Sequence, residues 1–460
     1  MIVMKFGGTS VQDAAAINQA VEIVAGKLDR SPVVVVSAMA GVTDALLLIA
    51  RLAGEHRFDD ASPIIDQLRE RHLTTARELL NKPAEHSFYQ VAQGLQENLT
   101  ELEGFARSVA TLGELTPRTQ DTIASFGERL SSALVASALQ ARGVSAELVD
   151  SREFIITNDR FTSAAPNFPE TEARARYSLL PIIESGRVPV AQGFIGSTTE
   201  GATTTIGRGG SDYSAAIIGA AIGAEAIEIW TDVDGLMTAD PRVVRDARRI
   251  RVISFAEASE LSYFGAKVLH PSTVLPAVER AIPVHIFNTR NPECEGTLIV
   301  ATPKRSLNVI KSIAFKRGVT IVNVASTRML LAYGFLRTIF EVFDRHQTSV
   351  DVVTTSEVSV SMTLDNADQL EAIKRDLSGI GAVSIERDKA IVCVVGDNLK
   401  FTPGVAARLF KAIESTNVNM ISQGASEINL TFVIEESEAE RVVQSLHEEF
   451  FSEADSEVFA

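Results

Sequence analysis

The sequence predicts an α/β protein in which a largely parallel central sheet lies between helices and two smaller domains of βαββαβ order follow. Two observations predict this fold class. Through the first 300 residues, short runs that are apolar throughout alternate with segments of helical periodicity, and strands buried on both faces are typical of covered parallel sheets. The last 150 residues contain an internal repeat, which indicates a duplicated domain.

The candidate strands of the first region are apolar runs that lead into polar or glycine-rich turns. They are IVMKF (2–6), PVVVVSA (32–38), AELVD (146–150), VPVAQGFIG (188–196), AIEIWTDVDG (226–235) and PVHIFN (283–288). The segments between them are amphipathic: over 13–28, apolar residues such as Ile17, Val21 and Val24 recur at helical spacing. We therefore expect one α/β domain over residues 1–300.

The internal repeat has an offset of 70 residues and needs no gap. The matched pairs are Gly334/Gly404, Ile321/Ile391, Val322/Val392, Val324/Val394, Phe340/Phe410, Ser356/Ser426 and Glu357/Glu427. Each copy reads strand, glycine turn, helix, two strands and helix. The first copy closes with a strand at 382–386, whereas the acidic end of the second copy is a poor strand. We expect domains over 301–388 and 389–460, the second completed by a strand from about 298–310, around Leu298–Val300 or Leu307–Ile310, so that the copies interlock.

Composition narrows the classes of partner and compartment. The 460 residues carry 43 basic and 59 acidic side chains, a net charge of −16, which argues against nucleic acid or an anionic membrane as the main partner. Cys294 and Cys393 are far apart in sequence and lack histidine clusters, so neither a disulfide framework nor a zinc site is predicted. No apolar run approaches a membrane span and no leader pattern precedes the first strand. We expect a cytoplasmic protein.

The first glycine-rich loop, KFGGTSV (5–11), follows the first strand directly. Ser10 and Asp13 form a plausible capping box for the next helix. The N–H groups of Gly7, Gly8 and Thr9 would then converge on an anion at a helix N-terminus, beside the charge of Lys5. An ordinary glycine turn with a solvated lysine is an equal alternative on this stretch alone. The residues that define a P-loop or a dinucleotide-binding fingerprint are absent from the sequence.

A second glycine-rich loop favours the phosphate interpretation. The stretch TTTIGRGGSDYSAAIIGAAIGA (203–224) places Arg208, Ser211 and Asp212 just before a small-residue helix. Two cationic glycine loops at helix starts suggest one phosphate held from both sides. Asp212 either complements the helix dipole or holds Lys5 in a fixed pose.

Two further loops carry polar residues. IWTDVDGLMTADPR (229–242) follows a strand, where α/β proteins bind ligands. Its aspartates resemble the start of a calcium loop, but no Glu falls at the twelfth position, so we interpret the stretch as a loop at the edge of a nucleotide site. FGAKVLHPST (264–273) supplies Lys267 in a glycine turn, for which a surface loop is an equal alternative.

Six motifs in this order resemble the aspartate kinases of the amino-acid kinase family: KFGGTSV, VVVVSAMAGVTDAL, SFGERLSSAL, GRGGSDYSAA, TDVDGLMTADPR and FGAKVLHP. The resemblance covers essentially the whole chain, since the repeat looks like the paired ferredoxin-like ACT domains that follow the kinase domain in that family. It implies transfer of the γ-phosphoryl group of ATP to L-aspartate, the first step toward lysine, threonine and methionine, with no attached homoserine dehydrogenase. The alternatives are a kinase of another small carboxylate or amino acid, and a catalytically inactive amino-acid-sensing subunit.

The resemblance also assigns roles to residues of the first domain. Lys5 and Asp212 would be the catalytic pair, and ATP would enter with Mg²⁺, for which no protein ligand is assigned. The residues implied for ATP and phosphate are Lys5, Gly7, Gly8, Thr231, Asp232, Arg242 and Lys267, and those for L-aspartate are Thr43, Glu128, Arg208 and Ser211. From the residues alone, Glu128 is also compatible with a helix-surface charge. Met237 stands where many relatives carry tyrosine, which puts one nucleotide contact in doubt.

The ACT resemblance implies feedback regulation at a dimer interface, so we expect a homodimer or a higher oligomer. The stretch 334–365 resembles the lysine-inhibited class, and its implied effector residues are Met329, Phe335, Leu336, Ser349, Val350, Asp351, Thr355 and Glu357. Carboxylates at 351 and 357 suit an amino-group ligand. Leu331 and Ala332 offer no side-chain hydrogen bond, so lysine would bind weakly or another amino acid would be the effector. Ordinary strand and helix positions of an ACT fold are an equal interpretation of these residues.

Overall fold

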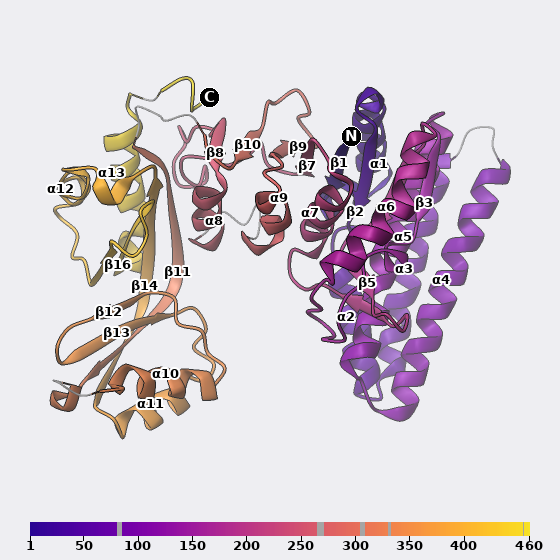
Figure 1. The fold of residues 1–460 in the computed structure, drawn as a ribbon. Helices are drawn as coiled ribbons and strands as arrows, with labels where there is room; N and C mark the ends of the chain where they lie inside the picture. Colours follow the sequence, from indigo (N-terminus) through magenta and orange to yellow (C-terminus); the bar gives the residue numbers. More distant parts are fainter. Residues whose placement is uncertain (81–84, 265–270, 304–308, 330–332, 454) are drawn as a thin grey trace. The chain divides into compact units, whose positions relative to one another are not determined.

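The computed structural model describes residues 1–80, 85–264, 271–303, 309–329, 333–453 and 455–460. The chain forms two compact units, which Figure 1 shows coloured along the sequence. Unit 1 comprises Met1–Leu236, Val252–Phe255 and Val268–Pro303, and unit 2 comprises Met237–Arg251, Ala256–Lys267 and Lys304–Ala460.

Unit 1 is built on an eight-stranded sheet of order β3-β4-β2-β1-β7-β9-β10-β8. Its strands are β1 (Ile2–Phe6), β2 (Pro32–Val36), β3 (Ala146–Val149), β4 (Val188–Gln192), β7 (Ala226–Thr231), β8 (Val252–Ser254), β9 (Val284–Asn288) and β10 (Thr297–Val300). All neighbours pair in parallel except β9 and β10. The prediction of a largely parallel sheet is confirmed, and β1, buried at every residue, lies between β2 and β7.

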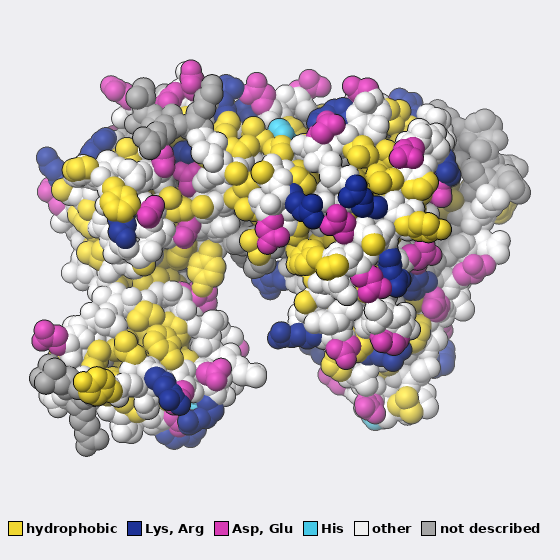
Figure 2. All heavy atoms as spheres, viewed as in Figure 1, with side chains coloured by type: hydrophobic (Ala, Val, Ile, Leu, Met, Phe, Trp, Pro, Cys, Tyr) yellow, Lys and Arg dark blue, Asp and Glu magenta, His cyan; other side chains and the backbone are white. Residues whose placement is uncertain are grey.

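Helices cover this sheet. They are α1 (Ala14–Ala25), α2 (Val42–Gly54), α3 (Phe58–Leu80), α4 (Glu85–Leu112), α5 (Pro117–Ala141), α6 (Phe168–Glu184), α7 (Gly210–Ile222) and α9 (Leu275–Glu279). Helices α2 to α5 pack against one another beside the sheet, as Figure 1 shows. On the face in Figure 2, acidic and basic side chains are interspersed over the helices of unit 1.

Two expected elements of unit 1 have different bounds in the structure. The segment 188–196 was predicted as one strand, which is wrong: β4 ends at Gln192, and β5 (Ile195–Ser197) pairs with β6 (Thr203–Thr205) in a separate two-stranded sheet. The reason is Phe194, whose φ of 65° takes the backbone out of the extended region. Helix α1 ends at Ala25 because Gly26 forms its C-cap.

Unit 2 contains a six-stranded antiparallel sheet of order β12-β13-β11-β14-β16-β15. Its strands are β11 (Ile310–Ala325), β12 (Val353–Thr355), β13 (Ser359–Leu364), β14 (Ala382–Gly396), β15 (Met420–Gln423) and β16 (Asn429–Glu435). The helices associated with this unit are α8 (Phe255–Phe264), α10 (Phe335–Arg345), α11 (Leu370–Ser378), α12 (Val405–Ala412) and α13 (Ala439–Phe451).

The two copies of the repeat share the long strands β11 and β14. The C-terminal half of β11 pairs with the N-terminal half of β14 in the first copy, and Ile310–Lys316 pairs with Ile391–Gly396 in the second. The start of β11 therefore supplies the fourth strand of the second copy. The alternative at Leu298–Val300 is wrong, because those residues lie in β10, between β9 and β8 of unit 1. Of the other candidate, Ile310 is the first residue of β11, and Leu307 lies outside the described residues.

Two segments expected in the first domain associate with unit 2. In the segment 237–251, the carbonyl of Thr238 accepts a hydrogen bond from the N–H of Ile313 at 2.8 Å. The carbonyl of Met237 accepts another from the hydroxyl of Ser312 at 2.8 Å. In the segment 256–267, Glu257 of α8 forms an ion pair at 3.0 Å with Lys311 of β11, and both side chains are almost fully buried. Within the described part of the chain, no helix is both long enough and apolar enough to span a membrane.

Candidate functional site

A cavity of about 580 Å³ opens in unit 1 beyond the carboxyl ends of β1 and β2. Predicted site residues from four separate segments line it: Lys5, Gly8, Thr43, Glu128, Arg208, Ser211 and Asp212. Residues after the carboxyl ends of parallel strands are where ligands bind in open α/β sheets. The structure thus brings together the two catalytic candidates and all four aspartate candidates.

The centre of this cavity is an ion pair between Lys5 and Asp212, with Nζ and Oδ1 separated by 2.6 Å. Lys5 is the fourth residue of the buried strand β1, and Asp212 lies in the first turn of α7. Both side chains are nearly buried, at 10% and 13% exposure, so the attraction between their charges is screened much less than at the surface. Of the two roles expected for Asp212, the structure shows the contact with Lys5.

The backbone of the KFGG loop differs from the expected arrangement. The N–H of Gly7 donates to the carbonyl of Trp230 at 3.0 Å, so it is not available to an anion. The predicted capping box is wrong: Asp13 itself is the N-cap of α1, accepting from the N–H of Ala16 at 2.9 Å, while the Ser10 hydroxyl contacts Trp230 and Thr289. A short 3-10 helix (Gly8–Val11) occupies the position where the box was expected.

Gly8 is required by close packing. A Cβ atom at this position would lie 2.9 Å from the carbonyl oxygen of Ala38, which is backbone and cannot move aside. The carbonyl of Gly8 also accepts from the N–H of Ala40 at 3.1 Å. Gly8 therefore holds the loop after β1 tightly against the loop after β2, and this contact shapes the cavity wall.

Glu128 lines this cavity and has one carboxylate oxygen without a hydrogen-bond partner. The residue lies on α5 at 3% exposure. Its Oε1 accepts from the N–H of Ala38 at 3.1 Å, whereas Oε2 is buried without a hydrogen-bond partner. Burial raises the pKa of Glu128 to about 8, against the smaller lowering effect of the Ala38 N–H. A buried acceptor without a partner is costly, so this oxygen is suited to a ligand that brings a positively charged donor.

Asp121 is a lining residue that the sequence reasoning missed. It is 1% exposed on α5, and its carboxylate accepts from Thr162 N (3.0 and 2.9 Å), Thr205 N (2.9 Å) and Thr205 Oγ1 (2.7 Å). Burial raises its pKa, while these hydrogen bonds act in the opposite direction. The signal was present in the sequence, because Asp121 precedes Glu128 by seven residues, two helical turns, and so shares its helix face.

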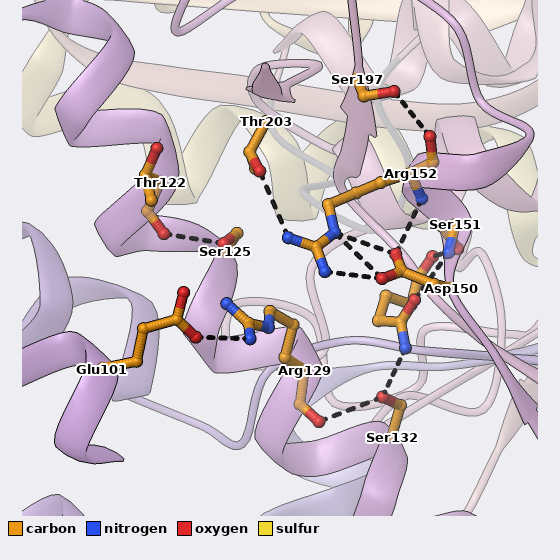
Figure 3. Close-up of polar contacts among 11 residues, drawn as sticks. Glu101, Thr122, Ser125, Arg129, Ser132, Asp150, Ser151, Arg152, Ser197 and Thr203 are labelled. Carbon is orange, nitrogen blue, oxygen red and sulfur yellow. Dashed lines mark hydrogen bonds and ion pairs between the residues drawn. The ribbon is translucent and has the colours of Figure 1, made fainter. Parts of the chain in front are cut away.

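A polar network lies along the same helix and around β6, as Figure 3 shows. The Arg152 guanidinium binds Asp150, with Nη2 and Oδ2 at 2.6 Å, and donates to Thr203 Oγ1 at 3.4 Å. The Ser197 hydroxyl donates to the carbonyl of Arg152 at 2.6 Å. The network thus links the 3-10 helix after β3 (Ser151–Glu153) to both strands of the small sheet.

The nucleotide candidates do not gather in this cavity. Thr231 and Asp232 line a second cavity in unit 1, of about 290 Å³, together with Thr9 and Ser10. Arg242 belongs to unit 2, where its exposed side chain pairs with Asp240 at 2.6 Å. Lys267 lies outside the described residues. Among the described ranges, no group of three or more His, Cys, Asp or Glu side chains is arranged to hold a metal ion.

The effector candidates lie in unit 2, around the start of α10 and the segment that follows this helix. Met329, Phe335 and Val350 pack partly buried against the core of the first repeat copy. Leu336, Ser349, Thr355 and Glu357 are exposed. Leu331 and Ala332 lie outside the described residues.

Asp351 is the effector candidate with the most specific surroundings. Its Oδ1 accepts a short hydrogen bond from the hydroxyl of Tyr263 on α8, and its Oδ2 is buried without a hydrogen-bond partner. Burial, reinforced by the nearby Asp365, raises the pKa of Asp351 to about 6. Lys316 pairs with Asp365, and its Nζ lies 5.5 Å from the centre of the Tyr263 ring. Tyr263 could not be recognised from a local motif, because it is 88 residues from its partner.

Two family models match separate stretches of the chain. Residues 1–288 match the model of the amino acid kinase family. Residues 392–450 match a model of the ACT domain.

The chain is similar to known proteins over nearly its whole length. It is 40% identical to lysine-sensitive aspartokinase 3 of Escherichia coli (strain K12), over 98% of this chain and 99% of that protein. It is 39% identical to chloroplastic aspartokinase 1 of Arabidopsis thaliana, over 98% of this chain and 80% of that protein.

Solved structures agree with this similarity. E. coli aspartokinase III in complex with aspartate and ADP superposes with a TM-score of 0.82 at 37% identity, covering 98% of this chain and 100% of that one. The same enzyme in complex with lysine and aspartate gives a TM-score of 0.84 at 38% identity, covering 98% and 99%.

Proposed function

The chain belongs to the amino acid kinase family and, within it, to the aspartokinases, and on that premise we propose how its residues act. It is a phosphotransferase that moves the γ-phosphoryl group of ATP to the side-chain carboxylate of L-aspartate, giving ADP and 4-phospho-L-aspartate. The observation that carries the residue assignment is one cavity holding the Lys5–Asp212 ion pair and the unpaired oxygen of Glu128.

Lys5 and Asp212 form the catalytic pair. The acceptor carboxylate of aspartate is ionised at neutral pH, so the enzyme needs no general base. Catalysis then depends on alignment and on balancing the negative charge of the transferred group. Lys5 supplies a cation at the transferring phosphate, and Asp212, 2.6 Å away, fixes the direction of its ammonium group. Gly8, which packs closely against Ala38 and lines the cavity, presents no side chain to the phosphate.

L-aspartate is held by groups of opposite charge that line the same cavity. Glu128 accepts from the α-ammonium group through Oε2, which has no protein hydrogen bond to give up. Arg208 pairs with the α-carboxylate, for which a planar guanidinium is suited. Thr43 and Ser211 line the cavity and supply hydroxyl groups.

ATP is the phosphoryl donor, and we assign Mg²⁺ to it as the accompanying ion. The donor groups present fit a cation carried by the nucleotide, because Mg²⁺ is commonly held by substrate phosphates and water rather than by a protein cage. Thr231 and Asp232 of unit 1 are the described candidates for the nucleotide beyond its phosphates; for Arg242 and Lys267 the assignment stays a prediction from the sequence. Gly7 contributes through the shape of its loop.

The ACT part of the chain binds a regulatory amino acid. L-lysine is the proposed effector, since the chain is similar to an aspartokinase named as lysine-sensitive, and Asp351 and Glu357 are carboxylates suited to its amino groups. A homodimer through the ACT domains is the proposed assembly. The effector and the substrates would then change one another's affinity by the same factor.

The test is steady-state phosphorylation of L-aspartate with MgATP, with the acyl phosphate trapped as its hydroxamate and L-lysine added in a parallel series. Lys5→Ala is expected to lower kcat by about a hundredfold or more, because it removes charge stabilisation at the transferred group. Lys27→Ala is the matched control, because Lys27 pairs with Glu228 at 2.8 Å and Glu228 keeps Arg30. Equal activity in wild type and Lys5→Ala would overturn the proposed role of Lys5.

A further inference from the structure

We propose that Asp121 is a positioning residue for L-aspartate, fixing the loop that carries Arg208 by anchoring strand β6 to helix α5. The inference rests on the proposed function and concerns a residue to which that function assigned no role. It follows from the different ways in which the two buried carboxylates of α5 are bonded.

Asp121 and Glu128 face the same cavity, but only Glu128 has an oxygen to offer a ligand. Both Asp121 oxygens accept from protein donors, namely the N–H of Thr162 and the N–H and hydroxyl of Thr205. Glu128 Oε2 has no such partner. Asp121 could contact substrate only by giving up these bonds, so its role is to hold protein segments in place.

The first segment that Asp121 holds is the loop over 158–166. Thr162 adopts a φ of 71°, a left-handed conformation that is unfavourable for a β-branched residue. Its N–H points to both Asp121 oxygens, at 3.0 and 2.9 Å. Two residues later, the N–H of Ala164 donates to the carbonyl of Thr205 at 2.9 Å. The strained loop and β6 are therefore fixed as one wall of the cavity.

The second segment is β6, whose three threonines are each anchored by a different element. Thr203 accepts from Arg152 at 3.4 Å, as Figure 3 shows, and the hydroxyls of Thr204 and Thr157 are 2.8 Å apart. Thr205 donates to Asp121 through both its N–H and its hydroxyl. Of these three anchors, Asp121 holds the residue nearest to Arg208 in sequence.

Arg208 depends on this anchor because the loop itself is built from glycines. Gly207 and Gly209 flank Arg208 and both have positive φ, 80° and 72°. Their freedom means that the position of the guanidinium is set by what fixes the ends of the loop. One end is the start of α7, and the other is Thr205 and Ile206, where the N–H of Ile206 also donates to the carbonyl of Phe194 at 3.0 Å.

The expected signature is a change in aspartate recognition with the nucleotide unaffected. Asp121→Ala removes four hydrogen-bond contacts, two from the N–H of Thr162 and two from Thr205. If Arg208 is displaced by about 1 Å as a result, KM for aspartate should rise on the order of 10- to 100-fold. KM for MgATP should stay within about twofold of wild type, and kcat should fall less than KM rises.

Two further variants grade the effect. Asp121→Asn keeps an acceptor for the N–H groups, and the Thr205 hydroxyl can reverse to accept from the new amide, so a smaller rise of about three- to tenfold is expected. Ser125→Ala is the matched control: Ser125 is buried on α5 between the two carboxylates, and its hydroxyl bonds only its own helix, at Thr122 O. It should leave KM for aspartate unchanged.

The measurements are steady-state kinetics at varied aspartate and varied MgATP, and calorimetric binding of aspartate, all on the full chain. A selective rise in KM and in the Kd for aspartate, in the order Ala, Asn, Ser125→Ala, is the expected result. If KM for MgATP rises equally, or Ser125→Ala matches Asp121→Asn, Asp121 is merely structural and the proposal is overturned. If Asp121→Ala does not fold, the comparison of Asp121→Asn with Ser125→Ala decides. If wild type phosphorylates no aspartate, the proposed function fails instead.

Discussion

Glu128 in unit 1 and Asp351 in unit 2 have the same arrangement of hydrogen bonds but different partners. Each carboxylate has one oxygen that accepts a hydrogen bond and one buried oxygen without a hydrogen-bond partner. The partner of Glu128 is the backbone N–H of Ala38, whereas the partner of Asp351 is the side-chain hydroxyl of Tyr263. Burial raises both pKa values, to about 8 and about 6.

The two hydrogen-bond donors differ in whether they can move away from the carboxylate: the backbone N–H of Ala38 is fixed, whereas the hydroxyl of Tyr263 can be released. A backbone N–H at the end of a core strand stays in place whether or not ligand is bound, so Glu128 is preorganised for the amino group of a substrate. A tyrosine hydroxyl can leave by rotation of its side chain, so a ligand at Asp351 can replace it. The proposed roles, substrate binding for Glu128 and regulation for Asp351, therefore differ in whether the protein partner of the carboxylate can leave.

The largest expected effect comes from removing the charge of Glu128. Glu128→Gln should raise KM for aspartate about a hundredfold, because the α-ammonium group loses its charged partner at a buried position. Inhibition by lysine should be unchanged. Steady-state kinetics with and without lysine measure both quantities. A variant with normal KM would remove Glu128 from the substrate side of the comparison.

Thermal unfolding provides the folding control for Glu128→Gln. The pKa of Glu128 is raised from 4.5 to about 8 in the folded state, so its contribution to stability is present below pH 4.5 and is lost as the pH rises through 8. At pH 8 the neutral glutamine avoids this loss. The variant should unfold at the same temperature as wild type or higher, so a raised KM would not reflect unfolding.

The second effect comes from removing the charge of Asp351 in unit 2. Asp351→Asn should weaken inhibition by lysine by about 10- to 30-fold and leave KM for aspartate unchanged, since the residue belongs to unit 2 and bonds Tyr263 there. Titration of activity with lysine, paired with calorimetric binding, measures it. Glu357→Gln is the informative companion, because Glu357 is an exposed effector candidate and should have the smaller effect. Full inhibition of Asp351→Asn would show that the two carboxylates do not play parallel roles.

The sequence predicted the strands and the cavity better than it predicted the bonding inside them. Apolar strand runs and the glycine loops around Lys5 and Arg208 depend on local composition, so Lys5 and Asp212 could be found from those loops, whereas Glu128 was assigned by the family resemblance of its helix motif. Thr162 and Tyr263 could not be found locally, since their partners are 41 and 88 residues away, and the spacing of Asp121 on α5 does not reveal its partners Thr162 and Thr205. Their roles depend on tertiary contacts that leave no local pattern.

The misassigned capping box has a similar physical origin. Ser10 and Asp13 have the residue types of a cap, but Ser10 finds better partners across the fold at Trp230 and Thr289. The strand predicted over 188–196 fails because apolar composition does not reveal the left-handed turn at Phe194. In both cases, contacts with distant segments decided between two locally acceptable conformations.

A third effect uses pH to separate the two carboxylates. Glu128 must be ionised to accept from an ammonium group, so kcat/KM for aspartate should rise about eightfold from pH 7 to 8.5, through a pKa of about 8. Lysine affinity should be level over that range, because the pKa of Asp351 is about 6. Glu128→Gln should lose the rise. The other titratable groups lining the cavity are Lys5, Asp44, Asp121, Arg208 and Asp212. A rise that persists in Glu128→Gln would assign it to one of them.

The smallest effect tests whether the Tyr263 hydroxyl is released from Asp351 when ligand binds. Tyr263→Phe keeps the ring beside Lys316 and removes only the hydroxyl that donates to Asp351. With the Tyr263 hydroxyl gone, Asp351 keeps Asp365 as a neighbour but loses a donor that competes with the ligand, so lysine should bind about threefold more tightly, the value of one net hydrogen bond. No equivalent variant exists for Glu128, since a backbone N–H cannot be removed by changing a side chain. Calorimetry of lysine binding to the full chain measures the change, with Tyr333→Phe as the control for an exposed tyrosine in the same unit. Weaker binding would mean that the Tyr263 hydroxyl assists the ligand, and Asp351 would then be preorganised in the same way as Glu128.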